Sequence, residues 1–139
     1  MSTLGAARAN TPSMPFDVLD LLAVIVGVLH TVRKLDVMKR RAQDFPHVAP
    51  ADFADWQERE RAAYALGSWA CFAKILLDPA LWLLAPKLEL AATTMRILAA
   101  SIDLGWFALV MLAMLRASRA RRRRNELGIA LYDPHQSSS

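Results

Sequence analysis

Apolar residues gather in three long stretches of this 139-residue chain, and charged residues gather between them. Residues 21–32, 62–73 and 104–115 contain no Asp, Glu, Lys or Arg. Each stretch continues at its ends into further, mostly apolar sequence. Because roughly 20 helical residues cross a hydrocarbon core of about 30 Å, the pattern predicts three membrane-spanning helices. We expect these spans at about 15–33, 62–85 and 89–115.

Prolines and polar residues predict where the helices begin and end. Ser13 is a suitable cap for the first helix, with acidic residues in its first turn. Pro46 and Pro50 separate the first helix from the second, because proline lacks a backbone donor and disfavours helix before it. Within the second helix, Pro79 either kinks a continuous helix or starts a short interfacial helix capped by Asp78. We expect the continuous, kinked helix.

Basic residues predict the orientation of the spans. Thirteen Lys and Arg lie in residues 33–61 and 116–124, whereas the N-terminal segment and the 86–89 turn hold only Arg8 and Lys87. The positive-inside rule therefore places the N-terminus outside and the C-terminus inside. We expect a bacterial plasma membrane or a mitochondrial inner membrane.

The predicted fold is an all-α integral membrane protein with three transmembrane helices in an up-down-up arrangement. The first two helices extend on the inner side as a short hairpin. The expected organisation is a flexible N-terminal segment, a three-helix membrane domain with an inner connection and a basic stop, and a flexible C-terminal tail. These parts cover residues 1–14, 15–124 (connection 34–61, stop 116–124) and 125–139.

Two of the spans carry charged residues that oppose insertion. Residues 90–115 include ten Leu, Ile, Val or Phe, each contributing about −0.3 to −0.6 kcal/mol. Arg96 and Asp103 oppose this by up to about 2.5–3.5 kcal/mol each if central. The second and third helices are therefore expected to insert as a hairpin. A soluble helical bundle is the alternative, but the wide polar face of a soluble amphipathic helix is missing.

The charges within the hairpin lie at depths where they can pair. If the chain turns near Leu88, Lys74 is fourteen residues from the turn and Asp103 is fifteen, whereas Asp78 is ten away and Arg96 eight. This arithmetic predicts Lys74–Asp103 and Asp78–Arg96 pairs, and Lys74–Asp78 is possible within one helix. A charge away from water must be paired or neutralised. We favour a structural clasp over an ion or proton pathway built on these residues.

Small residues four apart occur in each span and allow close helix packing in lipid. The pairs are Ala23 and Gly27, Ala63 and Gly67, and Ser101 and Gly105.

His30 is the only histidine within a span. Haem ligation by two histidines needs a second one in the membrane, so an ordinary packed histidine is favoured over a haem contact. We expect no metal and no cofactor.

An arginine cluster follows the third span directly, which favours a stop-transfer role and contact with anionic lipid head groups. Aromatic residues that would stack on bases are absent from the cluster, so we expect no nucleic acid partner. The cluster comprises Arg116, Arg119, Arg121, Arg122, Arg123 and Arg124.

The chain offers no catalytic constellation, so we do not expect an enzyme. The favoured function is a small non-catalytic subunit or assembly element of a larger membrane complex, with membrane lipids and other membrane subunits as partners. An oligomeric ion or proton conductor using Lys74, Asp78, Arg96 and Asp103 is the first alternative. A cofactor-holding respiratory membrane anchor is the next, followed by a soluble helical interaction domain.

Overall fold

The computed structural model describes residues 17–129, which form three α-helices and one short 3₁₀ helix. The long helices are α2 (Val18–Met38), α3 (Pro50–Leu84) and α4 (Ala92–Glu126), and η1 (Ala42–Asp44) lies between the first two. The all-helical part of the prediction is confirmed.

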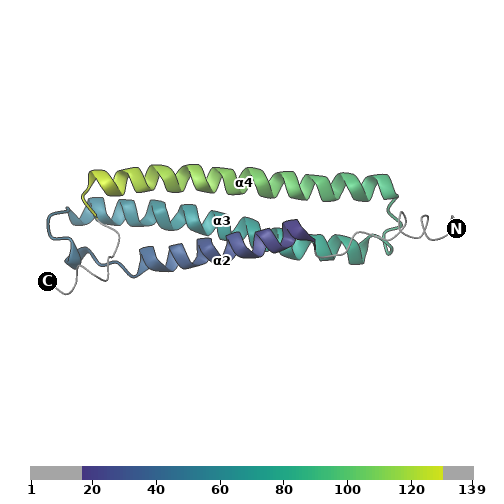
Figure 1. The fold of residues 1–139 in the computed structure, drawn as a ribbon, viewed down its shortest axis with the longest axis horizontal. Helices are drawn as coiled ribbons and strands as arrows, with labels where there is room; N and C mark the ends of the chain where they lie inside the picture. The colour runs from purple at the N-terminus through teal and green to yellow at the C-terminus, as the bar shows by residue number, and fades with distance from the viewer. Residues whose placement is uncertain (1–16, 130–139) are drawn as a thin grey trace.

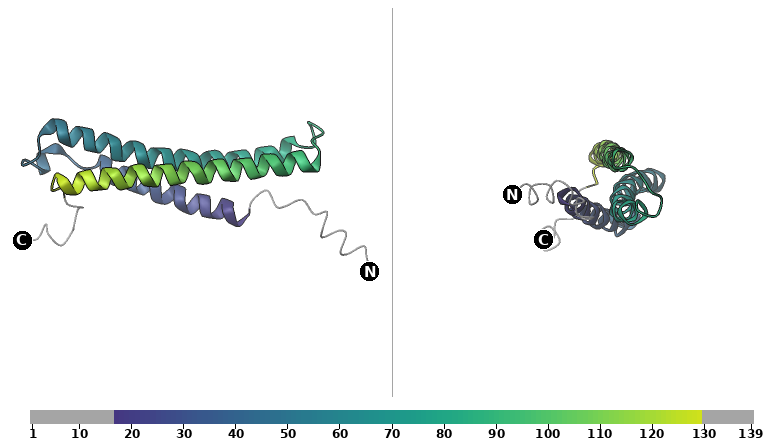
Figure 2. Two further views of the ribbon diagram at one scale, coloured as in Figure 1. Left: turned by 90° about the horizontal axis from the view of Figure 1, so that it is seen from above. Right: turned by 90° about the vertical axis from the view of Figure 1, so that its right-hand side faces the viewer.

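Helix α3 is the central element of the fold. It packs against α2 along one side and against α4 along another, while α2 and α4 make no direct backbone contact within residues 17–129. α2 is shorter than the other two and lies beside the η1 end of the α3–α4 hairpin, so the far end of the hairpin extends beyond it (Figures 1 and 2). A side chain on α3 is therefore best placed to contact both α2 and α4.

Side-chain hydrogen bonds satisfy both ends of α2. At its start, Asp17 and Asp20 form a reciprocal capping box, in which each carboxylate accepts from the other residue's backbone N–H at 3.0–3.1 Å. At its end, the Gln57 amide of α3 donates to the backbone carbonyls of Val37 and Arg40 at 3.0 and 2.9 Å. These bonds satisfy groups that a helix end leaves open. The predicted cap, Ser13, lies outside the described residues.

Helix α3 continues through Pro79 to Leu84, so the prediction of a continuous second helix is confirmed. Pro50 occupies the start of the same helix, where its missing N–H costs nothing. The turn that follows α3 includes Glu89 with a positive φ of 51°. It reverses the chain so that α4 runs back along α3.

The η1 end of the bundle is closed by an apolar cluster. Phe45 stacks on Phe53, which meets the Trp56 ring edge-on. Ile129 is 1% exposed in the same cluster, and the preceding Gly128 takes the positive φ of 70° that glycine tolerates.

The flexible tail was predicted from residue 125, but α4 continues to Glu126 and the chain packs against the bundle as far as Ile129. Residues 130–139 of that tail lie outside the described part.

Two helices, α3 and α4, are long and apolar enough to cross a membrane. Only 28% of the most apolar stretch of α3 and 17% of that of α4 is buried, whereas the core helix of a soluble protein is mostly buried. Trp69, Leu76 and Leu104 are 70–73% exposed. α2 is shorter and is not confirmed as a span.

Candidate functional site

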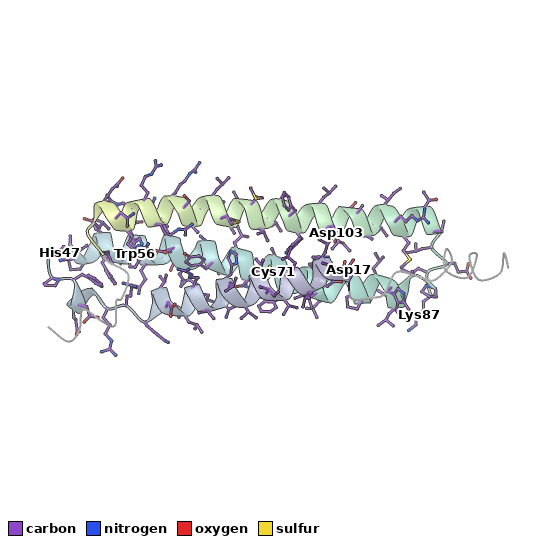
Figure 3. The ribbon with its side chains drawn as sticks, in the orientation of Figure 1. Asp17, His47, Trp56, Cys71, Lys87 and Asp103 are labelled. Carbon is purple, nitrogen blue, oxygen red and sulfur yellow. The ribbon has the colours of Figure 1, made fainter. Side chains whose placement is uncertain are left out.

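Lys74 lies at the point where all three helices meet. Its side chain is 1% exposed, and its Nζ donates to Asp78 Oδ2 at 2.6 Å and to Asp103 Oδ1 at 2.7 Å. The same Nζ lies 3.2 Å from Asp20 Oδ1. Figure 3 shows Asp103 on α4 facing the region where α2 begins. We call Lys74, Asp20, Asp78 and Asp103 the lysine cluster.

Local helix geometry explains why these side chains converge. Asp78 follows Lys74 by one turn on α3, and residues four apart share a helix face. The first turn of α2 brings in Asp20, whose backbone N–H and carboxylate also form the capping box. The Trp106 ring lies 5.7 Å from Lys74 Nζ, a cation–π distance. Its indole N–H donates to the buried Cys71 sulfur at 3.3 Å.

The predicted contacts of the clasp are present in part. The structure forms the Lys74–Asp103 and Lys74–Asp78 pairs. The predicted Asp78–Arg96 pair is wrong, because Asp78 bonds to Lys74 and Arg96 lies exposed on α4. With Lys74 opposite Asp103 in an antiparallel hairpin, the residue opposite Asp78 is Ala99. Arg96 lies three residues from Ala99, on the side of the turn between α3 and α4.

Asp20 belongs to the lysine cluster, although the sequence pattern favoured a helix-start role for it. The helix-start role is real, since Asp20 completes the capping box. Its second role, as an ion-pair partner of Lys74, depends on the position of α2 along the axis of α3. The hydropathy pattern does not determine that position.

The lysine cluster places one ammonium among three carboxylates. Asp20 is 2% exposed; its Oδ2 accepts from the Asp17 backbone N–H, but its Oδ1 has no hydrogen-bond partner. The Asp78 and Asp103 side chains are 15% and 36% exposed. Arg96, the other basic residue predicted at this depth, does not reach the carboxylates. The cluster therefore carries more negative than positive charge when all three acids are ionised.

A second buried ionic contact joins α3 to α4 near the η1 end. Arg124 Nη1 lies 3.4 Å from Glu60 Oε1, and the Tyr64 hydroxyl donates to the same oxygen at 3.2 Å. Glu60 is 1% exposed and Arg124 is 7% exposed. The prediction that Arg124 contacts lipid is therefore wrong, because its guanidinium points into the bundle to meet Glu60. Sequence reasoning missed this pair because Glu60 sits within a run of otherwise exposed charges.

The other arginines of the predicted lipid-contact group lie on or near the surface. Arg123 is half-buried, with nitrogens 3.7 Å from Asp52 and 3.6 Å from Glu126. The exposed members are Arg116, Arg119, Arg121 and Arg122.

The small residues divide into two groups. Ala23, Gly27, Ala63 and Gly67 are buried, whereas Ser101 and Gly105 lie exposed on α4. A Cβ at Gly67 would overlap the His30 ring, and one at Gly27 would lie 3.0 Å from the Cys71 Cβ. A Cβ at Gly105 would meet nothing within 4 Å.

His30 packs between α2 and α3. Its Nδ1 lies 2.8 Å from the Val26 carbonyl oxygen, and its ring meets the Tyr64 ring edge-on at 5.9 Å. Within residues 17–129, no group of three or more His, Cys, Asp or Glu has the arrangement of a metal site.

Comparisons of the chain with protein-family models, with curated proteins and with solved structures find no match.

Proposed function

We propose that this protein is a three-span membrane protein that serves as a non-catalytic subunit or assembly element of a larger membrane complex. In this proposal α2, α3 and α4 all cross the bilayer, with the N-terminus outside and the C-terminus inside. The lysine cluster ties the three spans together within the membrane. The faces that the bundle leaves open contact lipid and other membrane subunits.

The observation that carries the three-span proposal is a common spacing on all three helices. Thirteen residues separate Asp20 from Arg33, Lys74 from Arg61, and Asp103 from Arg116. At 1.5 Å per residue this is about 20 Å on each helix. The lysine cluster defines one level, so the three arginines fall at a second common level. Basic residues at one level are expected at the inner boundary of a membrane.

The outer boundary follows from the same register. A hydrocarbon core of about 30 Å corresponds to roughly 20 residues of helix. Counting from the inner arginines, this reaches Trp82 on α3 and Arg96 on α4. Tryptophan and arginine are both suited to the interface. Arg96 then lies at the outer boundary of the hydrocarbon core, and the lysine cluster lies about 10 Å below that boundary.

The exposed face of α4 supports a role in assembly. Ser101 and Gly105 are small residues on a largely apolar surface, and no neighbour within the described chain covers Gly105. In lipid, small residues let another helix approach closely. We propose that this face packs against another membrane subunit.

Head-group contact is proposed for the exposed arginines at the inner end of α4, Arg116, Arg119, Arg121 and Arg122. Each basic residue near an anionic surface contributes about 1 kcal/mol. The mixed-charge pairs Asp55–Arg59 and Glu58–Arg61 lie on the solvent side of α3, where they suit a soluble docking surface.

Two measurements test the proposal. Carbonate washing of isolated membranes should leave the protein in the pellet, and release into the supernatant would contradict the membrane location. The tagged full chain, purified in mild detergent, should retain a membrane partner that Gly105→Leu removes. Ala100→Leu, an exposed small residue on another side of α4, is the matched control. Purification of the chain without a stoichiometric membrane partner would contradict the subunit role.

A proton conductor is the second candidate, and one observation favours it. Polar side chains follow the buried face of α3 from the η1 end to the lysine cluster: Glu60, Tyr64, Ser68, Lys74 and Asp78. Ser68 lies 3.1 Å from the Thr31 hydroxyl of α2. The row is interrupted at the buried Cys71, which weakens it as a pathway.

Reconstituted vesicles distinguish the two candidates. With a potassium gradient and valinomycin, a non-conducting subunit should give no proton uptake above protein-free vesicles. Uptake that Glu60→Gln abolishes would establish the conductor instead.

A further inference from the structure

Within the lysine cluster, no hydrogen-bond donor links the carboxyl groups of Asp20 and Asp78 directly to each other. The Asp20 and Asp78 carboxyl groups both lie against Lys74 Nζ, at 3.2 and 2.6 Å, and are close enough to each other for a hydrogen bond. Asp20 Oδ1 is buried, and its ion-pair partner Lys74 Nζ, 3.2 Å away, does not form a well-aligned hydrogen bond with it. Two ionised carboxylates are both acceptors and cannot bond to each other. A proton placed between them would supply the missing donor.

The charge balance of the cluster also favours a bound proton. Groups that face these two acids come from every helix: Asp17 from α2, Lys74 from α3, and Asp103 from α4. Only Lys74 among them is cationic. Adjacent carboxylates in a medium of low polarity do not both stay ionised. A metal ion is not favoured as the balancing charge, since residues 17–129 present no arrangement of ligands for one.

We propose that the lysine cluster is a proton-binding site, in which Asp20 and Asp78 share one proton at neutral pH. The proton bridges Asp20 Oδ1 to the Asp78 carboxyl, while Lys74 donates to Asp78 Oδ2 and to Asp103. Lys74 and Asp103 balance each other, so the one excess negative charge that remains is shared by Asp20 and Asp78 across the bridging proton.

This site separates the three acids by role. Asp103 is the ionised partner of Lys74, and Asp20 and Asp78 form the protonated pair. Neutral asparagine at position 78 imitates the protonated acid, so Asp78→Asn should leave the bundle folded. The proposal relies on the three-span arrangement, because lipid around the bundle keeps out the water that would otherwise solvate a second ionised carboxylate in the pair.

Infrared spectroscopy of the full chain in lipid vesicles tests this site. Wild type at neutral pH should show the C=O stretch of one protonated carboxylic acid, shifted when H₂O is exchanged for D₂O. Asp78→Asn and Asp20→Asn should each abolish the band, and Asp55→Asn, at an exposed position on α3, should retain it. Absence of the band in wild type would overturn the proposal, as would a band that persists in both cluster variants.

Two controls keep the outcome specific. A circular dichroism spectrum shows whether each variant is helical; if Asp20→Asn unfolds through loss of the α2 cap, the Asp78→Asn result decides alone. If Asp78→Asn also unfolds, neutral asparagine does not imitate the native acid and the shared proton is rejected. Carbonate washing distinguishes the two proposals: a protein that stays in the membrane without the band loses only the proton site, whereas a protein washed off loses the three-span proposal.

Discussion

Lys74 Nζ and Asp103 Oδ1 lie 2.7 Å apart, and this contact joins α3 to α4 across a gap of 29 residues in sequence. Together with the approach of Asp20, it makes Lys74 the one side chain in the described bundle on which charged groups from all three long helices converge. The cluster is the basis of the first prediction.

Reversing the charge of Lys74 should destabilise the protein, and restoring a cation opposite should partly repair it. Lys74→Asp leaves four acids without a cation at the centre of the bundle, and breaking a buried ion pair costs about 3–5 kcal/mol. Adding Asp103→Lys returns one ammonium to the cluster. Thermal unfolding in detergent, followed by circular dichroism, should show a large loss for the single variant and partial recovery for the double. Equal losses would show that the cluster does not hold α3 to α4.

Gly67→Ala should separate α2 from α3. A Cβ at this position would overlap the His30 ring, and overpacking of this kind typically costs about 1–3 kcal/mol. Gly105→Ala is the matched control, because its Cβ would meet nothing within 4 Å. The melting temperature in detergent should fall for Gly67→Ala and stay constant for Gly105→Ala. The pair His30→Ala and Gly67→Ala should recover part of the loss, and a failure to recover would contradict the contact.

Removing Arg124 should destabilise the η1 end of the bundle. Its guanidinium is the cationic partner of Glu60, which is 1% exposed, and a buried acid without its partner costs about 3–5 kcal/mol. Arg124→Met should lower the unfolding temperature by more than Arg122→Met, which changes an exposed neighbour. Recovery is expected in the double variant Arg124→Met with Glu60→Gln. Equal effects of the two single arginine variants would show that Arg124 behaves as a surface residue.

The pKa of Glu58, in the part of α3 near η1, should lie below its ordinary range. The hydrogen bonds from Arg61 to this exposed carboxylate, at 2.5 and 3.0 Å, lower the pKa of Glu58. The small stabilisation that follows is present above the unfolded-state pKa and is lost as the pH falls through the lowered folded-state pKa. Carbon-detected NMR titration should show Arg61→Gln raising this pKa toward its ordinary value. An unchanged titration would show that the pair does not persist in solution.

The sequence predicts the helices better than it predicts their register. Charge-free stretches and prolines place α3 and α4, because insertion and helix termination depend on local composition. Counting from the turn predicts Lys74–Asp103, since both residues lie in one hairpin with a short connection. The same count fails for Asp78–Arg96 because a difference of two or three residues turns a side chain onto another face. The contacts of Asp20 and Arg124 are still harder to predict from the sequence, because they depend on the relative axial position and rotation of separate helices.

The location of the N-terminus tests the three-span arrangement most directly. If α2 crosses the membrane with α3 and α4, the two ends of the chain lie on opposite sides; if only α3 and α4 cross, both lie on the same side. Epitope tags at the N- and C-termini can be probed with protease in sealed, right-side-out vesicles, with detergent-opened vesicles as the control for cleavage. We predict that the N-terminal tag is cleaved and the C-terminal tag is protected. Protection of both tags until detergent is added would contradict the three-span arrangement.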